Sequence, residues 1–183
     1  MPTEFPIIHE VRKKQEQSRM VEELELEFSN GERRLYRRLL AQGEGAVIVV
    51  AMPDPAHVLL VREYAAGMER YELGPVKGSI DAGEDVLAAA NRELMEEAGF
   101  GARQLQVLKP LALSPSYMTH VAQVVLAEDL YEQRLPGDEP EPMEVVRWPL
   151  ANLGELVARD DISDGRAIAA LFIVREWLQR RAK

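Results

Sequence analysis

The stretch from Gly78 to Phe100 constrains this chain more than any other part of its sequence. It places a helical spacing of apolar residues and a run of glutamates within one short segment. The spacing predicts a helix over residues 85–98 with one apolar face, and the Gly99 that follows is a typical helix stop. That face comprises Leu87, Ala90, Leu94 and Ala98. The chain therefore needs a core that covers this helix.

The same helix carries three carboxylates close together. Glu93 and Glu97 are four residues apart and share a helix face, and Glu96 lies on an adjoining line. Such side chains repel one another, and hard cations such as Mg²⁺ remove the repulsion because they seek oxygen ligands. Bound metal ions can neutralise a pyrophosphate and activate water. We expect the apolar face to direct these carboxylates away from the core and toward a metal.

Two residues near the glutamates favour a metal-binding site over a solvated surface. Arg92 can hold carboxylates in a fixed orientation through paired hydrogen bonds. Gly78 lies in the loop before the helix, where the missing side chain lets other groups approach the backbone. A short run of Arg and Glu is usually a solvated face. Here the whole pattern has fixed spacing, which favours the functional interpretation over the solvated one: Gly78, Glu84, Arg92, Glu93, Glu96, Glu97 and Gly99.

Composition excludes several other classes of protein. The 183 residues fit one domain with an arm, and the absence of cysteine excludes disulfides and thiolate chemistry. The formal net charge of −9 argues against a non-specific nucleic-acid binder, since phosphate contacts need Lys and Arg. The start, Met1 to Pro6, lacks the layout of a signal peptide, and no apolar stretch is long enough for a membrane span. We therefore expect a cytoplasmic protein with no membrane partner.

The rest of the chain alternates strand and helix patterns. Residues 21–40 predict a β-hairpin turning at Ser29-Asn30-Gly31, whereas the polar residues 12–19 predict an irregular or exposed segment. An acidic, proline-bearing loop covers 128–142. This order indicates an α/β fold with a sheet covered on both faces. The remaining elements are strands at 46–51, 57–61, 107–113, 121–126 and 145–148, and helices at 151–158 and 163–180.

The Gly78 to Phe100 segment resembles the complete signature of the Nudix hydrolase superfamily, and most of the chain resembles its ADP-compounds hydrolase branch, NudE. The resemblance implies an α/β/α sandwich around a mixed sheet, with an N-terminal β-hairpin arm over 1–43 and the hydrolase domain over 44–183. It also implies Mg²⁺, with Mn²⁺ as an alternative, and substrates such as ADP-ribose, diadenosine polyphosphates and NADH. Segments that carry the branch resemblance include Arg62-Glu63-Tyr64-Ala65, Tyr71-Glu72-Leu73-Gly74, Ser114-Pro115-Ser116-Tyr117 and Val146-Arg147-Trp148-Pro149-Leu150.

The resemblance assigns roles to the matching positions. Glu93 and Glu97 would be principal metal ligands, and Glu96 would bind a metal or support the ligands. Glu84 would support the site and Arg92 would orient the glutamates, while the backbone carbonyl of Lys77 would complete a coordination sphere. In related ADP-ribose hydrolases a glutamate from a loop like 128–142 activates water or adds a metal ligand. Glu139 and Glu141 are the candidates here, with Glu139 favoured as the base; the alternative is a solvated acidic turn.

For several other residues the sequence leaves both a substrate-binding role and a purely structural role open. Arg62 can hold a phosphate or be a surface strand arginine, and Glu72 can accept from a ribose or base or form a salt bridge. Tyr64, Tyr71 and Tyr117 can stack on a base or pack in the fold. His120 approaches the substrate loop in one interpretation.

The resemblance further implies a homodimer. In related ADP-ribose hydrolases an arm like residues 1–43 exchanges between two subunits, a low-cost route to a two-fold dimer. The alternative is an edge extension of the chain's own sheet. The expected reaction is metal-assisted attack of water on a phosphorus of the ADP half of a small nucleotide substrate, which releases AMP. Two alternatives remain: a module that senses ADP-ribose without hydrolysing it, and a nucleoside triphosphate pyrophosphatase.

Overall fold

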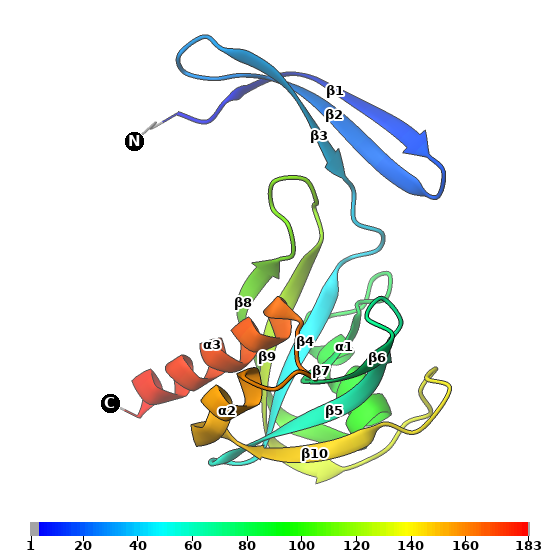
Figure 1. Cartoon of the computed structure of the whole chain (residues 1–183), viewed down its shortest axis with the longest axis vertical. Coiled ribbons are helices and arrows are strands. Elements are labelled where there is room, and N and C mark those ends of the chain that lie inside the picture. Colours follow the sequence, from blue (N-terminus) through cyan, green and yellow to red (C-terminus); the bar gives the residue numbers. More distant parts are fainter. Residues whose placement is uncertain (1–3, 183) are drawn as a thin grey trace. The chain divides into compact units, whose positions relative to one another are not determined.

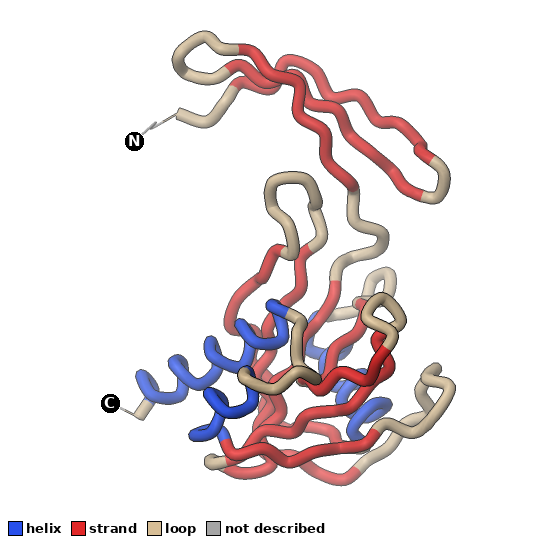
Figure 2. Tube along the Cα trace, in the orientation of Figure 1, coloured by secondary structure: helices blue, strands red, loops and turns tan. Residues whose placement is uncertain are grey.

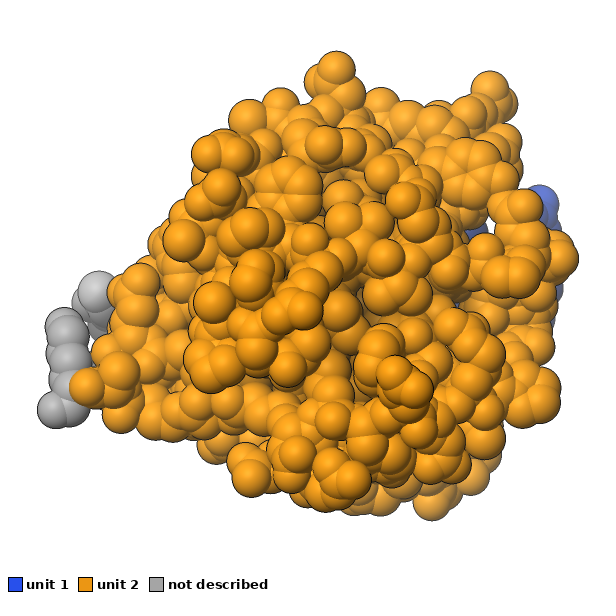
Figure 3. Space-filling model, turned by 90° about the horizontal axis from the view of Figure 1, so that it is seen from below, with its two compact units in different colours: residues 1–42, 112–121 blue, residues 43–111, 122–183 orange. Residues whose placement is uncertain are grey.

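The structure is a computed structural model that describes residues 4–182. The chain divides into a first unit, residues 1–42 and 112–121, and a second unit, residues 43–111 and 122–183 (Figure 3). The expectation of no signal peptide concerned residues 1–6, and residues 1–3 of these lie outside the described residues. Among residues 4–182, no helix is both long enough and apolar enough to cross a membrane.

The first unit contains an antiparallel sheet of three strands, β1 (Ile7–Glu16), β2 (Arg19–Glu27) and β3 (Arg33–Leu39). Strands β2 and β3 form the predicted hairpin, and Gly31 at its turn has a φ of +81°. The segment 12–19 is exposed, as expected, but it is not irregular, because β1 pairs with β2 along its length. Cross-strand ion pairs, such as Lys14 Nζ to Glu23 Oε2 at 2.7 Å, stabilise the pairing of polar β1 with the glutamate-rich β2.

The second unit is built on a seven-stranded sheet with the order β10-β5-β4-β9-β8 (Figures 1 and 2). Strand β6 pairs with β5 and strand β7 pairs with β4. The sheet is mixed, as predicted, because β4 pairs in parallel with β9 and antiparallel with β5 and β7. Its strands are β4 (Ala46–Asp54), β5 (His57–Ala65), β6 (Arg70–Gly74), β7 (Val76–Ser79), β8 (Phe100–Ala112), β9 (Val121–Glu132) and β10 (Glu144–Pro149).

Helices pack on both faces of this sheet, which confirms the predicted α/β architecture. One face is covered by α1 (Val86–Glu93) and the π-helical turn η1 (Leu94–Ala98). The other face is covered by α2 (Leu153–Val157) and α3 (Gly165–Arg181), with the short 3₁₀ turn η2 (Leu150–Asn152) leading into α2 (Figure 1).

Alternation along the central strands produces two separate cores. On β5, Val58 and Leu60 pack toward α2 and α3, whereas Leu59 and Val61 pack toward α1. Strand β4 alternates in the same way, since successive side chains of a strand point to opposite faces. The face on which a residue of β5 lies therefore decides whether it belongs with α1 or with α3.

Candidate active site

The predicted helix forms, but it changes its winding where the glutamates begin. The Asp85 side chain caps the first turn by accepting hydrogen bonds from the backbone N–H groups of Leu87 (2.9 Å) and Ala88 (3.3 Å). After Glu93 the regular α-helix gives way to the π-helical turn η1, a feature often found at functional sites. Gly99 ends the turn in the left-handed conformation, with a φ of +76°, as the sequence predicted.

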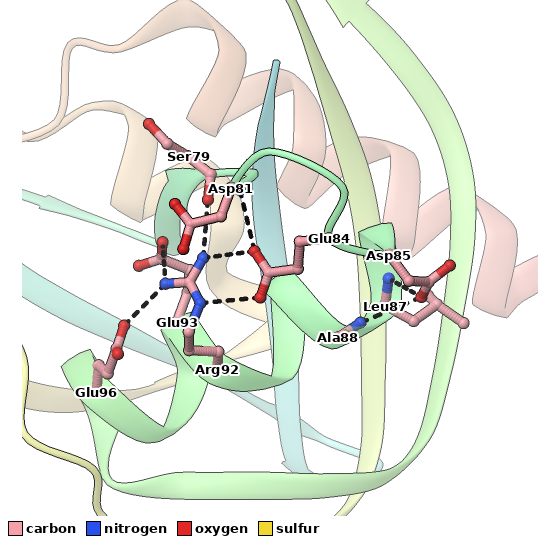
Figure 4. Close-up of polar contacts among 9 residues, drawn as sticks. All are labelled: Ser79, Asp81, Glu84, Asp85, Leu87, Ala88, Arg92, Glu93 and Glu96. Atoms are coloured by element: carbon pink, nitrogen blue, oxygen red, sulfur yellow. Dashed lines mark hydrogen bonds and ion pairs between the residues drawn. The ribbon is translucent and has the colours of Figure 1, made fainter. Parts of the chain in front are cut away.

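Arg92 is the centre of the hydrogen-bond network at this helix (Figure 4). Its guanidinium binds Glu84 through two parallel hydrogen bonds, Nε to Oε1 at 3.0 Å and Nη2 to Oε2 at 2.9 Å. Nη1 donates to Glu93 at 2.8 Å and to Glu96 at 3.0 Å, and Nη2 also donates to the carbonyl of Ser79 at 2.9 Å. These contacts raise the pKa of Arg92 further above its usual value, with the Glu84 hydrogen bonds as the largest cause. Arg92 thus sets the orientation of three glutamates.

Gly78 allows β7 to lie directly against the Glu93 carboxylate. A Cβ atom at position 78 would overlap the carboxylate carbon and both oxygens of Glu93. The backbone at Gly78 is paired with Val47 of β4 and is therefore fixed in the sheet. No side chain larger than hydrogen fits at this point while Glu93 keeps its place.

Glu93 and Glu97 are buried, with exposed fractions of only 8% and 4%. This differs from our expectation that the apolar face would direct them away from the core, because strand β7 covers the helix at this point. Burial raises the pKa of both carboxyls. The pKa of Glu97 reaches about 8, although the positive charge of Lys77 acts to lower it. Within residues 4–182, the one hydrogen bond to the Glu97 side chain comes from the Lys77 backbone N–H at 3.4 Å. The charge of Glu97 is therefore poorly compensated, whereas Glu93 has the Arg92 guanidinium as a partner.

A cavity of about 510 Å³ opens onto these buried acids. Seven acidic side chains line it, against the two cations Lys77 and Arg92. Sequence reasoning missed Glu63, which lies on β5 and forms an ion pair with the Lys77 ammonium. Its signal was the alternation of β5, which puts Glu63 on the same face as Leu59 and Val61. The acidic side chains are Glu63, Asp81, Glu93, Glu96, Glu97, Asp138 and Glu139.

The cavity suits a hard divalent cation. Within the described part of the chain, no group of three or more His, Cys, Asp or Glu side chains is already arranged to hold one ion. Arg92 binds one oxygen each of Glu93 and Glu96. Mg²⁺ does not require such a cage, because it is usually bound by one or two carboxylates together with water and substrate phosphates. Buried carboxylates with raised pKa values would gain from a cation placed among them. Glu93, Glu96 and Glu97 therefore fit the predicted metal.

The structure places the two loop glutamates differently. Glu139 lines the same cavity as Glu93, Glu96 and Glu97, and its charge contributes to the raised pKa of Glu93. Glu141 instead accepts a hydrogen bond from the Tyr71 hydroxyl, and this bond raises the pKa of Tyr71. Glu141 lines an adjoining cavity of about 530 Å³ that also contains Glu96, Glu97 and Glu139.

Arg62 and Glu72 have other partners, away from the carboxylate cavity. Arg62 donates from Nε to Glu144 and from Nη1 to Asp161, both at 2.8 Å. Glu72 accepts from Arg70 (2.6 Å) and from the backbone N–H of Ser163 (2.7 Å). Burial alone would raise the pKa of Glu72, but these hydrogen bonds outweigh it and lower the pKa. Neither residue lines the cavity that contains Glu93 and Glu97.

Neither Tyr64 nor Tyr71 lines the cavity that contains Glu93 and Glu97. Tyr64 and Tyr71 form an edge-to-face pair on β5 and β6, with ring centroids 5.4 Å apart. Both rings are about half exposed. Tyr117 and His120 lie in the first unit, where the Tyr117 carbonyl accepts a hydrogen bond from the Leu39 N–H at 2.8 Å. Their roles in substrate binding stay predictions.

Comparison with known proteins gives a consistent result over almost the whole chain. The model of the NUDIX domain matches residues 43–171, and that of the NudE-type Nudix hydrolase N-terminal domain matches residues 6–38. The ADP compounds hydrolase NudE of Escherichia coli is 51% identical over 163 residues, which cover 89% of this chain and 87% of that protein. The ADP-ribose pyrophosphatase of Bacillus subtilis is 29% identical over 80% of each chain. A crystal structure of an ADP compounds hydrolase superposes with a TM-score of 0.83 and 47% identity, over 97% of this chain and 96% of the other.

Proposed function

Because the chain belongs to the Nudix hydrolase family, we propose that it hydrolyses the pyrophosphate bond of ADP-linked compounds with the help of a divalent cation. The products would be AMP and the other phosphorylated half of the substrate. The names of its relatives support this substrate class, since one is an ADP compounds hydrolase and another an ADP-ribose pyrophosphatase. ADP-ribose, diadenosine polyphosphates and NADH are the substrates we propose. The observation that carries the proposal is the pair of buried acids, Glu93 and Glu97, facing one cavity.

Each side chain at the cavity has a separate task in this proposal. Glu93, Glu96 and Glu97, with the backbone carbonyl of Lys77, would hold Mg²⁺, or Mn²⁺ as an alternative. When bound, the cation supplies charge neutralisation and a more acidic water. Arg92 keeps the glutamates oriented, and Glu84 keeps Arg92 in place through the two-point contact. Glu141, in the adjoining cavity, is the further candidate ligand.

Glu139 is the proposed general base. It accepts a proton from water as the water oxygen bonds to a phosphorus of the ADP half. The bond from that phosphorus to the bridging oxygen breaks, and the bridging oxygen leaves on the other phosphate. Its place beside Glu93, Glu96 and Glu97 supports this role, since a base must come within hydrogen-bond reach of the attacking water.

The same proposal includes a homodimer and a cytoplasmic location. The match of residues 6–38 to a separate N-terminal domain model supports an arm with a task of its own. Exchange of this arm between two subunits would give a two-fold dimer. Sedimentation of the full chain would test it, since a purely monomeric protein at micromolar concentration would contradict the dimer.

A substrate panel tests the function directly. The protein is assayed with ADP-ribose, NADH, diadenosine triphosphate and nucleoside triphosphates, each with Mg²⁺ and with Mn²⁺, and the products are identified. We expect AMP and a phosphorylated partner from the ADP-linked compounds. Release of inorganic pyrophosphate from triphosphates alone would point to a triphosphate pyrophosphatase. Metal-dependent binding of ADP-ribose without product would point to a sensing module.

A further inference from the structure

The carboxylate cavity must attract an anionic substrate although most of its charged side chains are acidic. Bound cations can offset part of this repulsion. A basic side chain at the cavity would offset more of it and could donate a hydrogen bond to a phosphate oxygen. Arg92 and Lys77 are the two basic residues that line it.

Arg92 has no hydrogen-bond donor left for a substrate. A guanidinium carries five N–H groups. Arg92 makes five hydrogen bonds to protein oxygens: two to Glu84 and one each to Glu93, Glu96 and the Ser79 carbonyl. A phosphate could reach its nitrogens only by displacing a glutamate from the network that orients the proposed ligands.

Lys77 is different, because its ammonium still has donors to offer. An ammonium carries three N–H groups. Within residues 4–182, its one hydrogen-bonded partner is the Glu63 carboxylate. The Lys77 side chain is 36% exposed, so its end is open to a molecule in the cavity. The backbone N–H of the same residue donates to Glu97 at 3.4 Å, so Lys77 lies next to a proposed metal ligand.

Resting on the proposed function, we propose that the Lys77 ammonium binds a phosphate oxygen of the substrate directly, and that Glu63 is the positioning residue that holds it at the cavity. Glu63 of β5 forms an ion pair with the Lys77 ammonium of β7, and both residues line the cavity. This contact restricts a flexible four-carbon side chain to one place. Lys77 then contributes a point charge for phosphate that neither Arg92 nor the acids can provide.

The test compares Lys77→Met, which keeps the apolar stem and removes the charge, with Lys77→Arg, which keeps a charge. Lys109→Met is the matched control, because Lys109 lies on β8 beside Phe172 and Trp177 of α3, outside the carboxylate cavity. Steady-state kinetics with ADP-ribose at saturating Mg²⁺ gives KM and kcat, and inhibition by AMP gives a binding constant without turnover. Loss of a hydrogen bond to a charged group predicts a rise of about tenfold in both KM and the AMP inhibition constant for Lys77→Met.

The pattern of effects distinguishes this role from others. We expect kcat of Lys77→Met to stay within about twofold, because the contact exists in both ground and transition states. Lys77→Arg should recover most of the binding, and Glu63→Gln should raise KM by about twofold to threefold through looser positioning. Parent-like KM and AMP inhibition in Lys77→Met would overturn the proposal, as would a change confined to the Mg²⁺ concentration needed for half-maximal activity.

The substrate panel separates failure of this inference from failure of the proposed function. If the parent protein cleaves a different phosphoric anhydride, the Lys77 comparison is repeated with that substrate, since the inference requires only a phosphate. An unchanged KM in Lys77→Met with the true substrate then overturns the inference alone.

Discussion

The two faces of the second unit's sheet hold their acidic side chains in opposite ways. On the α3 face, Asp161 accepts hydrogen bonds from two arginines. Arg159 donates from Nε and from Nη2, each at 2.7 Å, and Arg62 donates from Nη1 at 2.8 Å. The hydrogen bond from Arg159 is the largest of the causes that keep its pKa far below the usual value. On the α1 face, Glu97 is more deeply buried and has one long backbone hydrogen bond, and its pKa rises to about 8.

This difference separates a structural acid from a functional one. Asp161 has its charge balanced within the fold, so no ligand is required to stabilise it. Glu93 shares Arg92 with Glu84 and Glu96, and among residues 4–182 Glu97 forms no salt bridge and accepts only the Lys77 backbone N–H. Acids that a fold buries without full compensation gain most from a bound cation. Substitutions matched across the two faces can test whether this contrast is correct.

The largest contrast is expected between Glu97→Gln and Asp161→Asn. Glu97→Gln removes a proposed metal ligand, and we expect kcat to fall by about 10²-fold to 10³-fold because transition-state charge loses its stabilisation. Asp161→Asn should keep kcat and instead lower stability by about 1–3 kcal/mol, since two arginines lose their partner. Turnover at saturating Mg²⁺ and thermal unfolding measure the two effects. Parent-like turnover of Glu97→Gln would remove the basis for the α1 face as the active site.

Two glycines give the next contrast. In Gly78→Ala the added methyl group would overlap the Glu93 carboxylate, so the ligand must move. We expect a fall in kcat of about 100-fold, comparable to other changes that displace the groups orienting a metal site. The control is Gly74→Ala, where the new Cβ would meet only Ala167 Cβ at 3.9 Å, an ordinary contact. Equal activity of the two variants would mean that the close approach at Gly78 has no catalytic value.

A third contrast compares the arginines. Arg92→Lys loses the two-point contact with Glu84 and cannot serve three glutamates, so kcat should fall by about tenfold to 100-fold. Arg62→Lys should leave kcat and KM unchanged, because Arg62 binds Asp161 and Glu144 on the α3 face. The readout is the full kinetic profile with ADP-ribose. A raised KM in Arg62→Lys would restore the sequence-based hypothesis that Arg62 binds phosphate.

Arg62 and Glu63 show what the sequence could not decide. The local pattern predicted a strand at 57–61, and β5 continues to Ala65, so that it includes both residues. The face on which each residue lies depends on which side of the sheet the glutamate helix packs. That choice is made by contacts between distant segments: Leu59 and Val61 pack with α1, and Leu60 packs with α2 and α3. Neighbouring residues of a strand point to opposite faces of the sheet, so Glu63 lies on the cavity side and Arg62 on the other. The sequence analysis named Arg62 as a candidate for phosphate binding and did not name Glu63, which lines the cavity.

Strong local signals were predicted well and weak ones were not. The capped helix with Gly99 at its end and the turn at Ser29-Asn30-Gly31 both have a local chemical cause, and both form. The strands β6 and β7 are only five and four residues long, and their pairing with β5 and β4 defines them. Burial of Glu93 also escaped prediction, because it results from the approach of β7 at Gly78.

The smallest expected effect is a pH dependence that the α1 face has and the α3 face lacks. Glu97 has a folded-state pKa of about 8, above its ordinary value of 4.5, so its contribution to stability is present below pH 4.5 and is lost as pH rises toward 8. Asp161 has a lowered pKa, and its contribution is lost only on strong acidification. Mg²⁺ must displace the Glu97 proton at low pH, so the gain in Tm on adding Mg²⁺ should grow by about 2–4 °C between pH 6 and 8.5. Glu97→Gln should flatten this growth and Asp161→Asn should preserve it. A metal-induced gain in Tm that is constant with pH in the parent protein would show that cation binding does not involve the buried acid.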